Sequence, residues 1–349
     1  MNEKHLKQSL TRILETEIPE TMNLLPNIQT QAESTSAPRS RVVLRPRHVF
    51  VVAAMIVLAT GAYALYQLIA PPDPGMAAVS NAITQINQTQ TIASQSDDLQ
   101  NINVTLASAY ADANRINLTY SVTADAQSGG TTLFINPTLT DAAGTVYPFL
   151  SAGRGEVEEQ DGSSFTKIGS LSFDSTALAG APSTLDLTVH FDVAFSNDDV
   201  RAADPMGMMM AGGTDFPVTV PFYAGKVVAI GQTVDAGGTV VTLDRAVIAP
   251  SLTRLEICAA QETFAAAEWW AWSAVGGVNI GEQVVTSGET FSFAGAGGQM
   301  LDDSAQCRSV IVPYALDSRA GTWTVTLDAF KAEGGTQITG SWAFTFNVP

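Results

Sequence analysis

The chain has 349 residues and carries 34 acidic against 17 basic side chains, for a net charge of −17. Such an acidic balance argues against nucleic-acid binding, which relies on basic patches that neutralise phosphates. The charge is unevenly divided, because residues 1–48 have a net charge of +2 and the remainder has −19. The two parts are therefore expected to work in different surroundings.

The first 48 residues predict a small head that contains an amphipathic helix. Its apolar side chains recur at helical spacing, and a segment of this size cannot bury a core of its own. We therefore expect the stripe to bind a protein partner, with lipid or a second copy as alternatives. Basic residues of the same helix would suit an anionic membrane surface. The stripe consists of Leu6, Leu10, Ile13 and Leu14.

Val49–Ala70 predicts a transmembrane helix. It has 22 residues without a charge, and at about 1.5 Å per residue such a helix crosses the roughly 30 Å hydrocarbon core. Four arginines lie close before it, at positions 39, 41, 45 and 47, and no Lys or Arg follows until Arg115, which predicts that the head is in the cytoplasm and the rest outside. The alternatives are a buried core helix, which would usually be shorter and amphipathic, and a signal peptide, which would start nearer the N-terminus.

Residues 71–84 are expected to form a stalk, and the chain beyond it two antiparallel β-sandwiches. Segments such as "INVTLASAY" and "GTWTVTLDAF" alternate polar and apolar residues, and clusters of Gly, Asn and Asp separate them. We expect sandwiches over 85–195 and 217–349, with a linker rich in Gly, Asp and Met at 196–216. "VTLASAYADANRINL" and "VTLDRAVIAPSLTRLEI" resemble each other at an offset of 137 residues, which indicates two related units.

Residues suited to catalysis or metal binding are sparse in the exported part. His190 is its only histidine, and no nucleophile elbow accompanies it. A structural role is therefore favoured over a Ser-His-Asp triad, and we do not expect an enzyme. Two cysteines and one histidine make no zinc ligand set, so no metal or cofactor is expected. Cys258 and Cys307 are the only cysteines and both are exported, which predicts a disulfide between them.

Two clusters have competing interpretations. Met206 and Met208–Met210 could bind Cu(I) through their thioethers, or they could belong to a flexible linker that packs against the domain junction. Trp269, Trp270 and Trp272 could bind a sugar or a partner. All five tryptophans lie in the second predicted sandwich, however, which favours a core built around them.

Three stretches carry a resemblance to a known family: "RPRHVFVVAAMIVLATGAYAL", "INQTQTIASQSDDLQNINVTLASAYADANRINLTYSV" and "FYAGKVVAIGQTVDAGGTVVTLDRAVIAPSLTRLEI". The layout resembles bacterial single-pass, anti-sigma-factor-like membrane proteins with tandem immunoglobulin-like exported domains. Asp112 and Arg115 match an Asp-x-x-Arg feature of that family. The resemblance covers most of 45–260, and the family's zinc motif of one His and two Cys is absent from 1–48.

The resemblance implies a membrane-anchored regulatory protein whose cytoplasmic head binds a sigma factor or another regulator. The exported part would sense or bind an unknown ligand of the cell envelope. The alternatives are an envelope-anchored binding or adhesion module, in which the head is only an anchor, and an exported enzyme. The apolar stripe of the head favours regulation, because a pure anchor needs only a few basic residues.

Overall fold

The computed structural model describes residues 74–349 apart from gaps at 97, 127–130, 153–156, 162–163, 179, 198–199, 201–206, 261–262, 264–271 and 295–304. The predicted head at 1–48, its stripe Leu6, Leu10, Ile13 and Leu14, and the predicted span at 49–70 lie outside the described residues. Within the described ranges, no helix is both long and apolar enough to cross a membrane.

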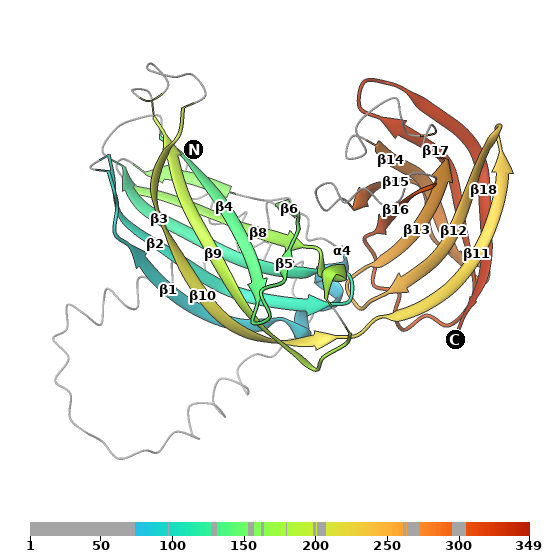
Figure 1. Cartoon of the computed structure of the whole chain (residues 1–349), viewed down its shortest axis with the longest axis horizontal. Coiled ribbons are helices and arrows are strands. Elements are labelled where there is room, and N and C mark those ends of the chain that lie inside the picture. The colour runs from blue at the N-terminus through green and yellow to red at the C-terminus, as the bar shows by residue number, and fades with distance from the viewer. Residues whose placement is uncertain are drawn as a thin grey trace, which may run out of the picture. The chain divides into compact units, whose positions relative to one another are not determined.

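Two β domains follow a pair of short helical turns (Figure 1). The turns are α4 (Pro74–Ala78) and η1 (Ser80–Ala82). The first β domain contains β1 (Thr84–Ile92), β2 (Leu99–Asp112), β3 (Ile116–Ala126), β4 (Thr132–Asp141), β5 (Val146–Tyr147), β6 (Phe149–Ala152), β7 (Val157–Asp161), β8 (Ser164–Phe173), η2 (Ser175–Ala177), β9 (Thr184–Ser196) and β10 (Met209–Tyr223). The second contains β11 (Lys226–Ala236), β12 (Thr239–Ile248), β13 (Thr253–Ala260), β14 (Trp272–Ile280), β15 (Gln283–Ala294), β16 (Ala305–Val312), β17 (Gly321–Ala332) and β18 (Gln337–Val348).

The first β domain is a sandwich of two layers. One layer has the order β1-β2-β3-β8 with β6 and β7 at its edge, and the other has the order β5-β4-β9-β10. A short parallel pairing of β10 with β2 connects them. Tyr120 of β3 and Phe191 of β9 are not on neighbouring strands, yet their rings lie 5.6 Å apart. The layers therefore pack face to face around one apolar core.

The second β domain repeats this strand order. Its sheet runs β11-β12-β13-β16-β15-β14-β17-β18, so each strand except β15 has a counterpart in the first domain. β15 pairs with both β14 and β16 and stands where the shorter β5 and β6 stand in the first domain. The sheet curls until β11 meets β18, where the amide of Gln232 donates to the Thr345 carbonyl and accepts from its N–H. Trp272, Trp323 and Trp342 are buried in the core, as the clustering of tryptophans predicts.

The two domains share details that confirm the repeat. β1 and β11 each contain a bulge with a residue in the left-handed region, Asn87 at φ 52° and Gly231 at φ 62°. Asn and Gly tolerate this conformation best. Two residues later, a threonine bonds the threonine of the Val-Thr-Leu strand at 2.8 Å in each domain. These pairs are Thr89 with Thr105 and Thr233 with Thr242.

The structure differs from the predicted boundaries at 196–216. Strand β10 begins at Met209 and pairs along its length with β9, so the connection between the domains is only Ala224–Gly225. Phe216, Val218 and Val220 point into the core of the first domain. The sequence of this strand contains prolines and glycines, which usually indicate turns, and we therefore did not predict a strand there.

Two further details concern the predicted segments. Within residues 71–84, the predicted stalk, α4 and η1 occupy most of the described part, and Gly75 and Val79 are buried. The β-sandwich class is confirmed, whereas the strand order is not that of an immunoglobulin sheet. There the order is A-B-E-D, while here the first three strands of each domain pair consecutively.

Candidate functional site

A buried polar network joins the β2–β3 turn to the β12–β13 turn. Asp112 at the end of β2 is fully buried, and its Oδ1 accepts the N–H groups of Asn114 at 2.9 Å and Arg115 at 3.0 Å. The Asp112 N–H also donates to the Arg115 carbonyl at 2.9 Å. Aspartate favours such turns because its carboxylate bonds nearby backbone N–H groups. The sequence "DANR" therefore builds a rigid turn by itself.

The other oxygen of Asp112 bonds to the second domain. Its Oδ2 accepts the Ser251 N–H at 3.0 Å and the Ser251 hydroxyl at 2.6 Å. It also accepts the Tyr110 hydroxyl at 2.9 Å. Arg115 Nε donates to Ser251 Oγ at 2.9 Å, so this hydroxyl bridges the two charged side chains. Burial, followed by the nearby Asp112 charge, raises the pKa of Tyr110 well above its ordinary value, which keeps that hydroxyl a donor.

A second connection runs from the second domain into the first. Arg254 in β13 donates from two guanidinium nitrogens to the two oxygens of Asp174, at 3.0 Å each. Both side chains are 6 % exposed, and this paired geometry is among the stronger ionic contacts in proteins. Asn114 donates through Nδ2 to the carbonyls of Val247 and Leu252, at 2.9 Å each. Each domain therefore holds the other through a buried arginine.

Two buried atoms of this network have no hydrogen-bond partner among the described residues. They are Asn114 Oδ1 and Arg254 Nε, on side chains that cross between the domains. An unsatisfied buried polar group costs about 1–3 kcal/mol.

Two glycines beside the junction, one in α4 and one in the domain connection, lie in close contact with its turns. A Cβ added to Gly75 in α4 would lie 1.6 Å from the Ser251 carbonyl oxygen and 3.0 Å from an Arg115 nitrogen. Only glycine fits there, so α4 lies directly on the β12–β13 turn. A Cβ on Gly225, in the domain connection, would come within 3.0 Å of the Ala113 Cβ. Tyr223, just before that connection, stacks on Tyr110 with ring centroids 5.6 Å apart.

His190 belongs to a separate cluster on the outer face of β9 and β10. Its Nδ1 lies 2.7 Å from Asp215 Oδ1 and its Nε2 lies 3.0 Å from Asp192 Oδ1. Gly213 leaves room for the pair, because a Cβ there would lie 3.0 Å from Asp192 Oδ1. With a carboxylate on each nitrogen, the ring has no position left to activate a nucleophile. The geometry fits the structural role expected from the sequence.

The pKa of His190 supplies a testable pH dependence. The hydrogen bonds to Asp215 first and to Asp192 second raise it above the ordinary 6.5. The stabilisation from the charged ring is fully present below the pKa of the unfolded chain and is lost as pH rises through the folded pKa. The side chain is 38 % exposed, so solvent screening should hold the gain below about 1 kcal/mol. In NMR titrations, assigned with His190→Gln, Asp215→Asn should lower this pKa more than Asp192→Asn. A wild-type titration at or below 6.5 would contradict the assignment.

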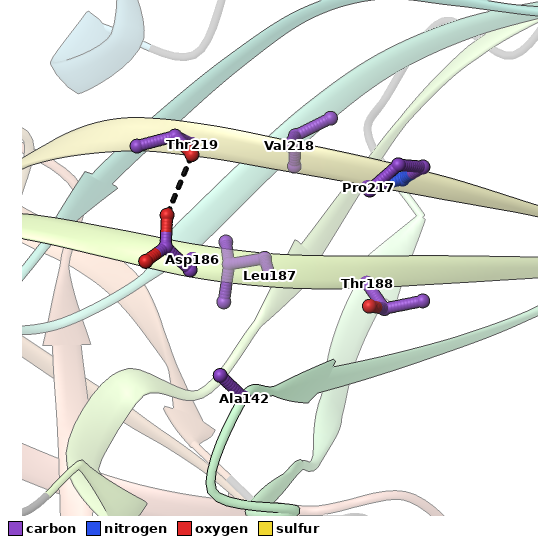
Figure 2. A pocket seen from close by; sticks show the side chains of 7 residues that line it. All are labelled: Ala142, Asp186, Leu187, Thr188, Pro217, Val218 and Thr219. Atoms are coloured by element: carbon purple, nitrogen blue, oxygen red, sulfur yellow. Dashed lines mark hydrogen bonds between the residues drawn. The ribbon is translucent and has the colours of Figure 1, made fainter.

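A shallow pocket lies on the same outer face, near one end of the β9–β10 pair (Figure 2). Asp186 is the one ionisable group among its lining residues, and its Oδ1 accepts the Thr219 hydroxyl at 2.6 Å. This lining offers no acid–base pair and no second charge for a ligand. The lining residues are Ala142, Asp186, Leu187, Thr188, Pro217, Val218 and Thr219.

The remaining predicted sites have mixed outcomes. The disulfide between Cys258 and Cys307 is confirmed and joins directly paired positions of β13 and β16. Met208, Met209 and Met210 are exposed at the start of β10, whereas Met206, Trp269 and Trp270 lie outside the described residues. Copper binding is the less favoured interpretation of this cluster, and it stays a hypothesis. Among the described residues, no group of three or more His, Cys, Asp or Glu side chains is arranged to hold a metal.

Sequence reasoning singled out Asp112 and Arg115 but missed Asp174, Ser251 and Arg254. A signal for Arg254 was present, because it interrupts an apolar strand, "LTRLEI", beside a turn. The turn bonds match Asp112–Arg115 with Ala249–Leu252, in agreement with the offset of 137 residues, so Arg115 and Arg254 occupy different positions of the repeat.

Comparison with known proteins gives a likeness of fold only. No family model matches the chain, and no curated protein matches it. The crystal structure of a conserved domain protein from Bacillus anthracis resembles it with a TM-score of 0.51 and 14 % identity, over 77 % of this chain and 92 % of that one. The CupB6 tip adhesin from Pseudomonas aeruginosa aligns over 76 % of this chain and 99 % of that one, at 10 % identity. The TM-score of that alignment is 0.19.

Proposed function

We propose that this chain is a membrane-anchored regulatory protein, similar to anti-sigma factors. Its exported β domains would sense or bind a component of the cell envelope. Its cytoplasmic head would bind a sigma factor or another regulator. The proposed topology rests on the uncharged segment Val49–Ala70 and the arginines before it.

The observation that carries the proposal is the packing of α4 on the junction between the β domains. Gly75 lies five residues beyond Ala70, a distance that extended chain covers in at most about 18 Å. Its close fit against the Ser251 carbonyl ties the residues next to the proposed span to contacts made by both domains. A binding or adhesion module on a flexible stalk has no need of such a connection.

In the proposed function, the head binds the regulator through its apolar stripe. Its apolar stripe has too few residues around it to be buried within the head. Each Leu or Ile of the stripe that becomes fully buried against a partner could contribute about 1.5–3 kcal/mol, from which ordering costs are subtracted. A groove on another protein is a common way to bury such a helix.

The test is co-purification of the full-length chain, tagged at its N-terminus, from detergent-solubilised cells. The wild type should retain a sigma factor, and a Leu10→Asp, Leu14→Asp variant should lose most of it, because charges on the stripe oppose its burial. A Lys7→Asp variant is the matched control, since it changes the charge of the helix but leaves the stripe intact.

Equal recovery by all three variants, or no regulator at all, would count against the proposal and favour the envelope binding module. A lipid-bound head gives a third pattern. It would bind anionic vesicles more weakly as salt rises, and it would retain no regulator.

A further inference from the structure

We infer that the junction between the β domains is a two-state latch. In the closed state the domains are held together by the bonds of the β2–β3 and β12–β13 turns and by the Arg254–Asp174 pair. In the open state the domains rotate apart about Ala224–Gly225, the junction side chains become hydrated, and α4 no longer packs against Ser251. The inference concerns the exported domains alone and stands without the proposed function, which adds only what the head would do in response.

Each β domain is complete without the other. Each has its own apolar core, one around Tyr120 and Phe191 and the other around Trp323 and Trp342. The connection between them is only two residues long. Separation would therefore leave both cores covered, and it needs backbone rotation at only a few positions, which is how hinges between domains usually work.

The contacts at the junction are made by charged and polar side chains. Asp112, Arg115, Asp174 and Arg254 are charged residues buried at the junction, and hydration in the open state would replace the bonds that they lose. Buried ion pairs of this kind fix a geometry more than they add stability. The two states are therefore expected to be close in free energy.

The packing of α4 depends on the closed state of the junction. Gly75 rests on the Ser251 carbonyl and beside the Arg115 guanidinium. These two residues belong to different domains, and they are bonded to each other only while the latch is closed. Opening therefore separates the two residues against which Gly75 packs, and we expect α4 to be released when the domains separate.

The test measures the distance between spin labels on the two domains of the full-length chain in detergent. Val146→Cys and Val284→Cys supply exposed positions, at 59 % and 62 %, and the native cysteines are joined in the disulfide. The wild type should show a narrow closed distance with a minor, longer one. Ser251→Ala should raise the ratio of open to closed molecules about tenfold, because it removes the hydroxyl that bridges Asp112 and Arg115.

A second label, at the exposed Ala77 of α4, tests the coupling. In Ser251→Ala, the mobile fraction of the label at Ala77 should rise together with the fraction of molecules that show the longer distance between the domains. Ser287→Ala is the matched control, since Ser287 is exposed and far in sequence from the junction turns. An unchanged narrow distance in Ser251→Ala, equal to that of Ser287→Ala, would overturn the latch.

Low urea supplies an independent measurement on the labelled wild-type chain, which needs no variant at the junction. All five tryptophans lie in the second domain, so their fluorescence reports the unfolding of that domain alone. If the junction is a latch, the fraction of molecules with the longer label-to-label distance should increase at urea concentrations that leave the tryptophan fluorescence unchanged. Simultaneous change of both signals would show that the domains form one rigid body.

Discussion

Replacement of Arg254 by methionine should destabilise the closed junction by about 3–5 kcal/mol, because it leaves Asp174 buried without its counter-charge. Asp174 is 6 % exposed and accepts hydrogen bonds from two guanidinium nitrogens of Arg254, one of which also donates to the Asn114 carbonyl. The change should shift most molecules to the open state and remove the protection against hydrogen exchange that closure gives the junction amides. Mass spectrometry of peptides that contain 112–115 and 250–253 would measure it.

The chain offers a matched control for this change. Arg245 also bonds a carboxylate, that of Glu256, but its side chain is 51 % exposed. Arg245→Met should therefore cost less than about 1 kcal/mol. A double variant, Arg254→Met with Asp174→Asn, should recover part of the loss, because no buried charge remains unpaired. Equal protection in Arg254→Met and Arg245→Met would show that the buried pair contributes little.

Removal of the disulfide should have a comparable effect within the second domain. Cys258 and Cys307 are 49 positions apart, and in the chain-entropy model closure of such a loop corresponds to about 4 kcal/mol. Cys258→Ala with Cys307→Ala should therefore lower the unfolding free energy reported by tryptophan fluorescence by about that amount. The first domain has no tryptophan, and its transition, followed by circular dichroism, should stay in place.

Two observations would count against this disulfide prediction. One is the titration of two free thiols in denatured, unreduced protein, which would mean that the bond is absent. The other is an equal shift of both domain transitions in the double variant, since the bridge joins β13 to β16 within the second domain alone.

Most of the strands could be predicted from the sequence because their cause is local. In β9, "TLDLTVHFDVAF" alternates residues that face the core with residues that face water, and that alternation requires a half-buried strand. β10 was missed for an equally local reason. Pro217 and Pro221 in "GGTDFPVTVPFY" look like turn residues, yet β10 has a full partner on only one side, where proline is tolerated.

The sequence by itself determined the β class, the internal repeat, the cysteine pairing and the self-contained turn Asp112–Arg115, because each follows from residue spacing or from contacts between near neighbours. The partners of that turn were decided only by the tertiary structure. Ser251 and Arg254 lie 139 and 80 residues from the carboxylates that they bond. No local pattern specifies such a pairing, since it depends on how two completed domains present their turns to each other. The same holds for Gly75, whose need to be glycine arises only from the carbonyl of Ser251 against which it packs.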